Sequence, residues 1–336
     1  MQNHGLFSRA LRSFKTRSKH YLQNALLHSM EITGAPQKFA RRNFIFQYFP
    51  SLFSGTPAYL NWEKAYAYFI TNRNRNVHLI DLNQVSAPSN LPTKKIAIQA
   101  HIFYPDIATE LAALLKDFPV PFDLLISTPH AGSEGLLRDI FKALPKLGDL
   151  DILVTPNRGR DLGPLLFEFG KKLMQYDYFA HVHTKKSVES NSIGNAWREY
   201  LFKNLLDSSQ NRTLKILGLL ENYGMVYPRK FPLIDVENCQ WGNNLAVAED
   251  FCRLANLPLP APGYIEFPAG SMFWAKTAAL QPLLDKPFLI DEFEEEMGQT
   301  DNTIMHALER SLAHIALSQG YPIALLQDPK LNRYYP

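Results

Sequence analysis

The stretch from Thr155 to Ser187, TPNRGRDLGPLLFEFGKKLMQYDYFAHVHTKKS, decides the fold. It starts at the end of an apolar strand, passes through the polar turn 157–161, and continues with the pattern of a helix from about Gly163 to Met174. A second apolar strand then leads to the polar residues 181–186. Two strands joined through a helix form a parallel crossover unit, and open α/β sheets bind ligands beyond the carboxyl ends of their strands. We therefore expect both polar segments at one ligand-binding edge.

The same alternation of strands and helices continues along the chain. Apolar runs predict further strands at 96–103, 122–127, 151–155, 225–227, 270–275 and 322–326. Helical patterns fall at 107–117, 134–144, 195–206, 212–222 and 300–319. Such alternation is typical of an α/β fold with a mostly parallel sheet, right-handed crossovers and flanking helices.

The first 94 residues follow a different pattern. A basic opening segment precedes an aromatic stretch at 44–53 and a helical pattern near 62–70. The polar segment 86–95 is typical of a linker. We predict two parts, a basic, aromatic-rich, helical N-terminal extension (1–94) and the α/β domain (95–336).

Composition limits the classes of function. The chain has 336 residues, of which 46% are hydrophobic, enough for a large core. Its net charge of +3 is too small to indicate a nucleic-acid partner. The first fifty positions contain several basic residues but a single carboxylate, Glu31. These basic residues could contact anionic lipid head groups or form a solvated basic helix. They are Arg9, Arg12, Lys15, Arg17, Lys19, Lys38, Arg41 and Arg42.

Cysteine usage and hydropathy bear on the compartment. With only Cys239 and Cys252, the sequence suggests neither a disulfide framework nor a thiolate zinc site. No apolar run is long enough to span a membrane, and the N-terminus lacks the apolar core of a signal peptide. We expect a cytoplasmic protein, with any contact at the inner face of the plasma membrane being peripheral.

Four cations end the two strands of the opening stretch. Arginine offers forked donors to phosphate oxygens, and lysine offers a compact charge. A bound diphosphate would relieve their mutual repulsion; alternatively, they pair with carboxylates such as Asp161, Glu168 and Glu189 on a solvated surface. The cations are Arg158, Arg160, Lys185 and Lys186.

His181 and His183 lie on one face of the second strand, because side chains alternate along a strand. Two imidazoles could hold a divalent metal, but the sequence does not point to a third ligand. Neutral histidines hydrogen-bonded in a cleft are the alternative.

Two further segments carry candidate residues. Gly270 and Ser271 precede an apolar strand and would let a ligand approach, while Trp274 could stack on a sugar or lie in the core. The acidic run 291–296 leads to Thr300 or Asp301 as a helix N-cap. A polar row on that helix face hints at a site, with Asp301 or Glu296 as a general base. The row comprises Asn302, His306, Glu309 and Arg310.

Six motifs together resemble the rhamnan synthesis protein F family. They are NRGRD (157–161), HVHTKKS (181–187), WREYL (197–201), GMVYP (224–228), GSMFWAK (270–276) and DNTIMHALER (301–310). The resemblance spans about residues 95–336 and implies a glycosyltransferase of bacterial surface polysaccharide assembly. The order of elements is also similar to the GT-A fold, in which a nucleotide sugar binds the Rossmann-like half and a later helix carries the catalytic acid or base.

The sequence departs from the GT-A pattern in one important place. A typical GT-A enzyme has Asp-X-Asp at this strand end to hold Mn²⁺ or Mg²⁺, whereas here the segment reads His181-Val182-His183-Thr184-Lys185-Lys186. We hypothesise that cations stabilise the leaving diphosphate without a metal, which leaves a divalent metal as the less favoured alternative. A smaller departure is Asn302, where relatives tend to have glycine.

The resemblance implies a sugar transfer, with rhamnose from its dTDP-activated form as one option, onto a surface polysaccharide or lipopolysaccharide. Asp301 and Glu296 are the candidate catalytic residues. Donor binding is assigned to Asn157, Arg158, Arg160, Asp161, His181, His183, Lys185 and Lys186, and acceptor binding to Gly270, Ser271, Trp274 and His306. Two alternatives stay open: a non-catalytic glycan-binding or scaffold module, and a hydrolase with a metal on the two histidines.

Overall fold

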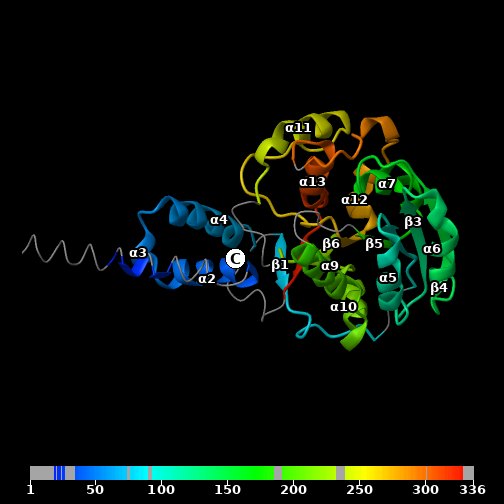
Figure 1. The fold of residues 1–336 in the computed structure, drawn as a ribbon, viewed down its shortest axis with the longest axis horizontal. Helices are drawn as coiled ribbons and strands as arrows, with labels where there is room; N and C mark the ends of the chain where they lie inside the picture. Colours follow the sequence, from blue (N-terminus) through cyan, green and yellow to red (C-terminus); the bar gives the residue numbers. More distant parts are fainter. Residues whose placement is uncertain are drawn as a thin grey trace, which may run out of the picture. The chain divides into compact units, whose positions relative to one another are not determined.

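The computed structural model describes residues 19, 21–23, 25–26, 35–73, 76–89, 93–184, 191–231, 239–299 and 301–327 (Figure 1). The chain forms two compact units. The first consists of Met1–Thr71, Pro232–Cys239 and Asp328–Pro336. The second consists of Asn72–Phe231 and Gln240–Gln327, and it contains the sheet.

The sheet has eight strands in the order β1-β8-β6-β7-β5-β2-β3-β4. Their bounds are β1 Val77–Ile80, β2 Ile96–His101, β3 Phe122–Thr128, β4 Leu147–Val154, β5 Tyr178–His183, β6 Met225–Pro228, β7 Phe273–Lys276 and β8 Ile323–Leu326. Neighbours pair in parallel except at β7, which is antiparallel to both β5 and β6. The predicted mostly parallel α/β sheet is confirmed. One of its strands, β1, precedes residue 95, and the predicted division into domains stays a prediction.

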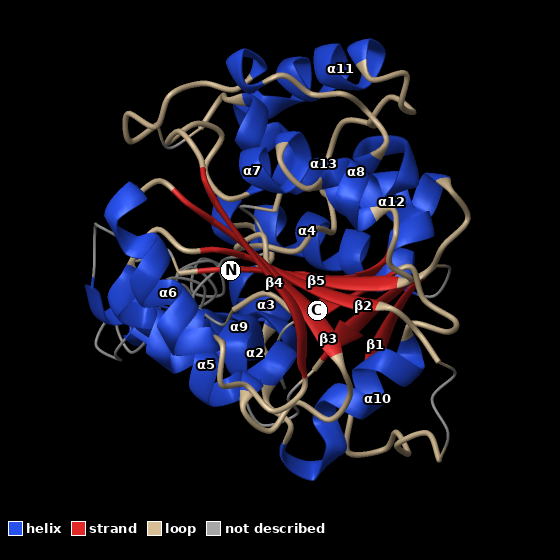
Figure 2. Cartoon of the chain, turned by 90° about the vertical axis from the view of Figure 1, so that its right-hand side faces the viewer, coloured by secondary structure: helices blue, strands red, loops and turns tan. Residues whose placement is uncertain are grey.

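Helices cover both faces of the sheet (Figure 2). One side carries α7 Leu162–Phe167, α8 Gly170–Leu173, α11 Leu245–Leu254, α12 Thr277–Leu284 and α13 Ile304–Ser318. The other side carries α5 Ala108–Leu115, α6 Glu134–Phe141, α9 Asn191–Leu206 and α10 Arg212–Leu219. Short 3₁₀ turns lie at Pro105–Ile107, Ala131–Ser133, Ser209–Asn211, Gly242–Asn244 and Ile290–Glu292. None of the described helices is both long and apolar enough to cross a membrane.

Alternation along the strands explains how both faces are buried. Ala97, Phe179 and Phe273 belong to one core cluster together with apolar side chains of α7, α8, α12 and α13. Residues one position away face the other helical layer; the Trp274 indole, for example, donates to the carbonyl oxygen of Leu205 on α9. A sheet covered on both faces needs apolar residues at successive positions, and this produces the continuous apolar runs in the sequence.

The helix predicted at 163–174 is interrupted and forms α7 and α8. Phe169, between them, has φ −113°. The next residue, Gly170, lies so close to α12 that an added Cβ would be 2.8 Å from the carbonyl oxygen of Leu284. The break therefore lies where the chain packs tightly against a neighbouring helix backbone.

The first unit is built from α2 (Ala35–Tyr48), α3 (Pro50–Phe53) and most of α4 (Pro57–Arg73). Its core is aromatic: the Phe46 ring centroid lies 5.2 to 5.5 Å from those of Phe53, Tyr59 and Trp62. The Trp62 indole donates a buried hydrogen bond of 2.7 Å to Asn43. Edge-on and tilted rings explain how so small a helical unit buries its aromatic side chains.

Candidate functional site

Polar side chains form a row across the carboxyl ends of three parallel strands. The register places Gln99 of β2 beside His181 of β5, and His101 beside both His183 of β5 and Ser127 of β3. All five are buried. By alternation they point to the sheet face that α7 and α13 cover, two or four positions beyond core residues such as Ala97 and Phe179. The fold thus buries a polar row directly under two helices.

Hydrogen bonds connect this row to Asp161, which immediately precedes α7. Ser127 Oγ lies 3.2 Å from Gln99 Nε2 and 3.0 Å from His101 Nδ1. His181 Nδ1 lies 2.5 Å from Gln99 Oε1, and its Nε2 lies 3.2 Å from Asp161 Oδ2. Both ring nitrogens of His181 thus lie within hydrogen-bond distance of side-chain oxygen atoms of the protein.

Asp161 is buried and nevertheless ionised. Burial by itself raises its pKa, but His183, His181 and His101 together outweigh that effect and hold the pKa of Asp161 well below its usual range. A buried carboxylate is tolerated when it is paired and hydrogen-bonded. The row and Asp161 therefore form a charge-paired network inside the protein.

A second chain of contacts leads from His183 to α13. His183 Nε2 donates to the carbonyl oxygen of Gly270 at 2.8 Å, and the Gly270 amide donates to Glu309 Oε1 at 2.7 Å. Gly270 has φ +88°, and an added Cβ would lie 2.9 Å from Leu201. Only glycine fits this position without strain, because both the backbone angle and the space exclude a side chain.

Glu309 has a pKa shift opposite to that of Asp161. Burial raises its pKa, outweighing the lowering by Arg310 and by the hydrogen bond from Gly270. Asp161 adds to the rise and Arg160 opposes it. Two carboxyl groups with opposite shifts can hold different protonation states, which is the property that acid–base chemistry uses.

The turn between β4 and α7 packs against the segment around Phe293. The Gly159 amide donates to the Glu294 carbonyl at 3.1 Å, and the Glu296 amide donates to the Asn157 carbonyl at 3.2 Å. Gly159 has φ +66°, and an added Cβ would lie 2.9 Å from the Phe293 ring. Asn157 itself is exposed. The glycine of NRGRD therefore permits close packing of two segments far apart in sequence.

Both arginines of this turn form ion pairs with that acidic segment. Arg158 lies 2.8 Å from Glu295 and 3.6 Å from Asp291, and it also donates to the Phe293 carbonyl at 3.1 Å. Its charge is thus balanced by carboxylates, as in the surface-pairing alternative. The partners come from residues 291–295, however, and not from Asp161, Glu168 or Glu189, the last of which lies outside the described residues.

Arg160 connects the turn to α13. Its Nε lies 2.6 Å from Glu296, its Nη1 lies 3.0 Å from His306 Nε2, and it donates to the Gln299 carbonyl. Arg160 holds φ +51°, an uncommon conformation for a residue with a side chain. The structure therefore brings together Arg160, Glu296 and His306, which sequence analysis had assigned to three different roles.

Asp301 lies in the segment just before α13. It accepts a hydrogen bond from Asn244, whose own side-chain oxygen accepts from the Asn302 amide at 2.9 Å. The expected N-cap at Thr300 or Asp301 is wrong for Asp301, because α13 begins at Ile304 and Thr303 caps it by accepting from the His306 amide. Asn302 has φ +60°, a left-handed conformation that glycine adopts without strain.

Ser271 and Trp274 follow Gly270. Ser271 is buried with φ +55°. Trp274 is fully buried on the opposite sheet face from the histidines, with its ring 6.1 Å from that of Phe118. The pairing of β5 with β7 explains this orientation. Phe273 pairs with His181 and lies on the same sheet face, so Trp274, which pairs with Ala180, lies on the opposite face. In this structure the indole is a core side chain and presents no face to a sugar.

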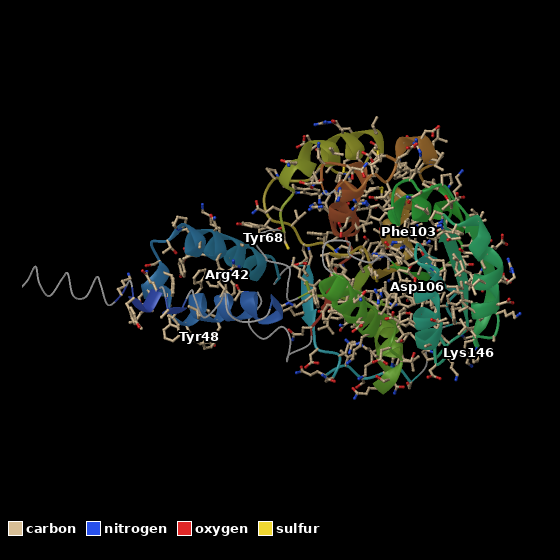
Figure 3. The ribbon with its side chains drawn as sticks, in the orientation of Figure 1. Arg42, Tyr48, Tyr68, Phe103, Asp106 and Lys146 are labelled. Carbon is tan, nitrogen blue, oxygen red and sulfur yellow. The ribbon has the colours of Figure 1, made fainter. Side chains whose placement is uncertain are left out.

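An aromatic group lies at the same carboxyl edge. The Phe103 ring, labelled in Figure 3, lies 4.9 Å from Tyr104 and 5.4 Å from His130. His130 donates through Nε2 to the Phe103 carbonyl at 2.9 Å, and the Tyr104 amide donates to Thr184 Oγ1 at 3.0 Å. These bonds join the ends of β2, β3 and β5.

Some predicted site residues lie outside the described part of the chain. Lys185, Lys186 and Thr300 belong to this group. Within the part that is described, no three His, Cys, Asp or Glu side chains gather as a metal-binding group.

The site also contains residues that sequence analysis did not assign. Gln99, His101 and Ser127 are buried members of the polar row, and Glu309 binds the Gly270 amide. A signal for the first three was present, because each interrupts an otherwise apolar buried strand. The sequence identifies Glu309 only as part of the polar face of its helix, without a specific role.

A family model described as rhamnan synthesis protein F matches residues 67–321, a range that contains every site residue named above. Two curated relatives are each called uncharacterized protein WxcX, from Xanthomonas campestris pv. campestris strains B100 and ATCC 33913. Both are 28% identical over 231 residues, covering 68% of this chain and 32% of the relative. The chain thus spans less than a third of the length of these relatives.

Proposed function

Because the chain belongs to the rhamnan synthesis protein F family, we propose that it is a glycosyltransferase using a nucleoside diphosphate sugar. Family membership supports a role in polysaccharide synthesis. The proposed acceptor is a surface polysaccharide or lipopolysaccharide, with rhamnose as one candidate sugar. One observation carries the proposal: the family-matched region collects arginines, histidines and carboxylates of opposite pKa shift at the carboxyl edge of parallel strands.

The donor diphosphate would take the place of the carboxylates on the arginines. The Arg158 and Arg160 side chains are 27% and 22% exposed. The Arg158 partners Asp291 and Glu295 are largely exposed, whereas the Arg160 partner Glu296 is only 18% exposed. A phosphate offers the same kind of anionic oxygen with more charge, so exchange preserves the pairing of each guanidinium. Lys185 and Lys186, which follow β5 in sequence, would add charge on the same side. The charge that develops on the leaving diphosphate would be stabilised by these groups.

The aromatic group at Phe103 supports a place for the nucleotide or sugar ring. Flat apolar faces next to hydrogen-bonding groups are typical of small-molecule sites. We assign Phe103 and Tyr104 to this role because they lie at the end of β2, beside the strands that carry the histidines.

Two carboxylates compete for the role of general base. Asp301 is the candidate from sequence and is held by Asn244. Burial raises the pKa of Glu309, and a raised carboxyl pKa favours the protonated form that can take part in proton transfer. Glu296 is bound to Arg160, so in the proposed mechanism it releases the arginine and does not act on the acceptor.

The test begins with donor binding. Thermal unfolding of the full chain is measured with UDP, GDP, dTDP and CMP sugars, and a ligand bound by the native state should raise the melting temperature. The binding donor is then used to measure release of the nucleotide and transfer to glycan acceptors, with and without EDTA. We expect one donor class to bind and be consumed, and transfer to persist in EDTA; activity restored only by Mn²⁺ or Mg²⁺ would contradict the metal-independent form.

Variants assign the base. Asp301→Asn and Glu309→Gln should both keep donor binding, and the one that abolishes transfer identifies the base. If no donor sugar binds or is consumed while oligosaccharides bind tightly, the chain is a glycan-binding module and the proposal fails.

A further inference from the structure

Three exposed aromatic side chains lie together on the first unit. Phe44, Tyr48 and Phe49, here called the aromatic patch, are 36%, 59% and 45% exposed. The rings are in contact, with centroids 4.7 Å apart for Phe44–Tyr48 and 6.5 Å apart for Phe44–Phe49. Figure 3 shows Tyr48 on the side of α2 away from α4.

The patch is distinct from the unit's own core. Asn43, Ile45 and Phe46 of the same helix are buried, and the Trp62 indole is bonded to Asn43. Helix α2 therefore buries one face inside the unit, while Phe44 and Tyr48 on another face, with Phe49 just after the helix, are partly exposed. An exposed group of large apolar side chains on a small unit indicates an interaction surface.

The formal charge of the sequence near the patch indicates the class of partner. Between Glu31 and Glu63 the sequence has no Asp or Glu, while it has Lys38, Arg41 and Arg42. The first fifty residues carry a formal charge of +7, and the remaining residues carry −4. Such a charge difference would orient the first unit toward an anionic surface and repel the rest of the chain from it.

We propose that the aromatic patch docks on an anionic lipid bilayer, with Phe44, Tyr48 and Phe49 at the level of the head groups. Aromatic rings bearing a polar tip favour the membrane interface, and neighbouring basic residues add attraction to anionic lipids. Neither the aromatic rings nor the basic residues suffice alone, because membrane binding of this kind depends on both buried apolar area and charge. The alternative partner for the patch is a second copy of this chain, and the experiment below distinguishes the two.

This proposal does not depend on the proposed reaction. Vesicle binding is measured without any donor or acceptor, and consumption of a donor in the absence of lipid should be equal in wild type and patch variants. Failure of one proposal can therefore be told from failure of the other.

The experiment measures sedimentation of the full chain with two kinds of vesicle, phosphatidylcholine alone and phosphatidylcholine mixed with phosphatidylglycerol. The wild type should bind the mixed vesicles, bind the neutral ones far less, and lose binding as salt is added. The triple change Phe44→Ser, Tyr48→Ser and Phe49→Ser should lower the partition coefficient about tenfold or more. Leu254→Ser, at a position that is 88% exposed in the second unit, is the matched control and should bind as the wild type does.

Two further measurements exclude a loss of folding. The triple leucine variant at the same positions should keep vesicle binding, because it keeps the apolar surface. Tyr48→Cys carrying an environment-sensitive dye should show a blue shift on mixed vesicles; the two native cysteines are buried and would not compete for the label.

Three outcomes would overturn the proposal. They are absence of wild-type binding to the mixed vesicles, unchanged binding by the triple serine variant, and loss of a wild-type dimer in that variant without any change in vesicle binding. The last result would assign the patch to a second copy of the chain.

Discussion

The two strand ends of the site differ in how exposed their paired polar side chains are. At the β4–α7 turn, Arg158 pairs with Asp291 and Glu295, whose side chains are 90% and 66% exposed. At the end of β5, His181 is fully buried and bonded to Asp161. The first pairing can exchange partners with solvent ions or ligands, because exposed ion pairs are weak. The second cannot open without leaving a buried charge unpaired.

This difference separates a fixed part of the site from an exchangeable part. The buried network fixes the geometry of the carboxyl edge. The exposed ion pairs of Arg158 can open, so that its guanidinium can bind an anionic ligand instead. Removing a fixed contact should therefore cost folding stability, whereas removing an exchangeable one should mainly cost ligand binding. The following changes test that separation, in order of decreasing effect on stability.

Asp161→Asn should have the largest effect. It leaves the buried His181 without its anionic partner, which typically costs about 3–5 kcal/mol of unfolding free energy. Because the pKa of Asp161 is lowered in the folded state, its contribution is present above the ordinary carboxyl pKa of about 3.9 and fades as the pH falls, so the variant and wild type should converge in acid. Urea unfolding from neutral to acidic pH measures both effects.

The matched control is Asp151→Asn. Asp151 pairs with Lys172 at 2.7 Å, but both side chains are about one-third exposed. It should lose about 1 kcal/mol or less. Equal losses at positions 151 and 161 would show that the buried network is not the stronger of the two.

Gly270→Ala should rank second. The methyl group would contact Leu201 and Trp197 and force an unfavourable backbone angle, for a cost of about 2–3 kcal/mol. Gly263→Ala separates the two causes, since Gly263 has φ +119° with nothing within 4 Å of an added Cβ. That control should lose only about 1 kcal/mol of backbone strain. Similar melting temperatures for the two variants would contradict the close approach at Gly270.

Arg158→Ala should change stability by about 1 kcal/mol or less but weaken donor binding about tenfold or more. The exchanged pair Arg158→Glu with Glu295→Arg tests the cause. It should restore the ion pair and the melting temperature without restoring donor binding, measured by titration calorimetry. Donor affinity equal to wild type in the single variant would remove Arg158 from the donor site.

Glu309→Gln should have the smallest effect on stability. The glutamine oxygen can still accept from the Gly270 amide, and the change removes a carboxylate that burial disfavours. Because the pKa of Glu309 is raised in the folded state, the wild type gains stability relative to the variant as the pH falls toward about 4.3. We expect a difference of about 0.5 kcal/mol or less at neutral pH, favouring the variant. A loss of several kcal/mol would show that Glu309 is charged and structurally required.

The sequence predicted elements better than it predicted partners. Continuous apolar runs located β2, β3 and β5, because a sheet covered on both faces requires them. The break between α7 and α8 was missed, because it depends on a close approach to α12 that only the folded chain reveals. The direction of β7 was missed as well, since the apolar pattern of one strand reads the same in both directions.

The same distinction between local pattern and tertiary contact holds for the site residues. That His181 and His183 share a face followed from the two-residue period of a strand. The partners of Arg158 and Arg160 could not be found this way, because they lie more than 130 residues away in sequence. The orientation of Trp274 depends on its register against β5, which local sequence does not encode. Contacts set by local periodicity were predictable, and those set by tertiary register were not.

The reversed direction of β7 has a consequence for how the family can diversify. A parallel strand brings its last residues to the carboxyl edge, whereas β7 brings its first, so the loop entering it delivers Gly270 to His183. The chain between β6 and β7 can then change in length or sequence without altering the crossovers that hold β2, β3, β4 and β5 in register. If the proposed sugar transfer is correct, acceptor preference could thus change through this segment while the strands of the proposed donor site stay as they are.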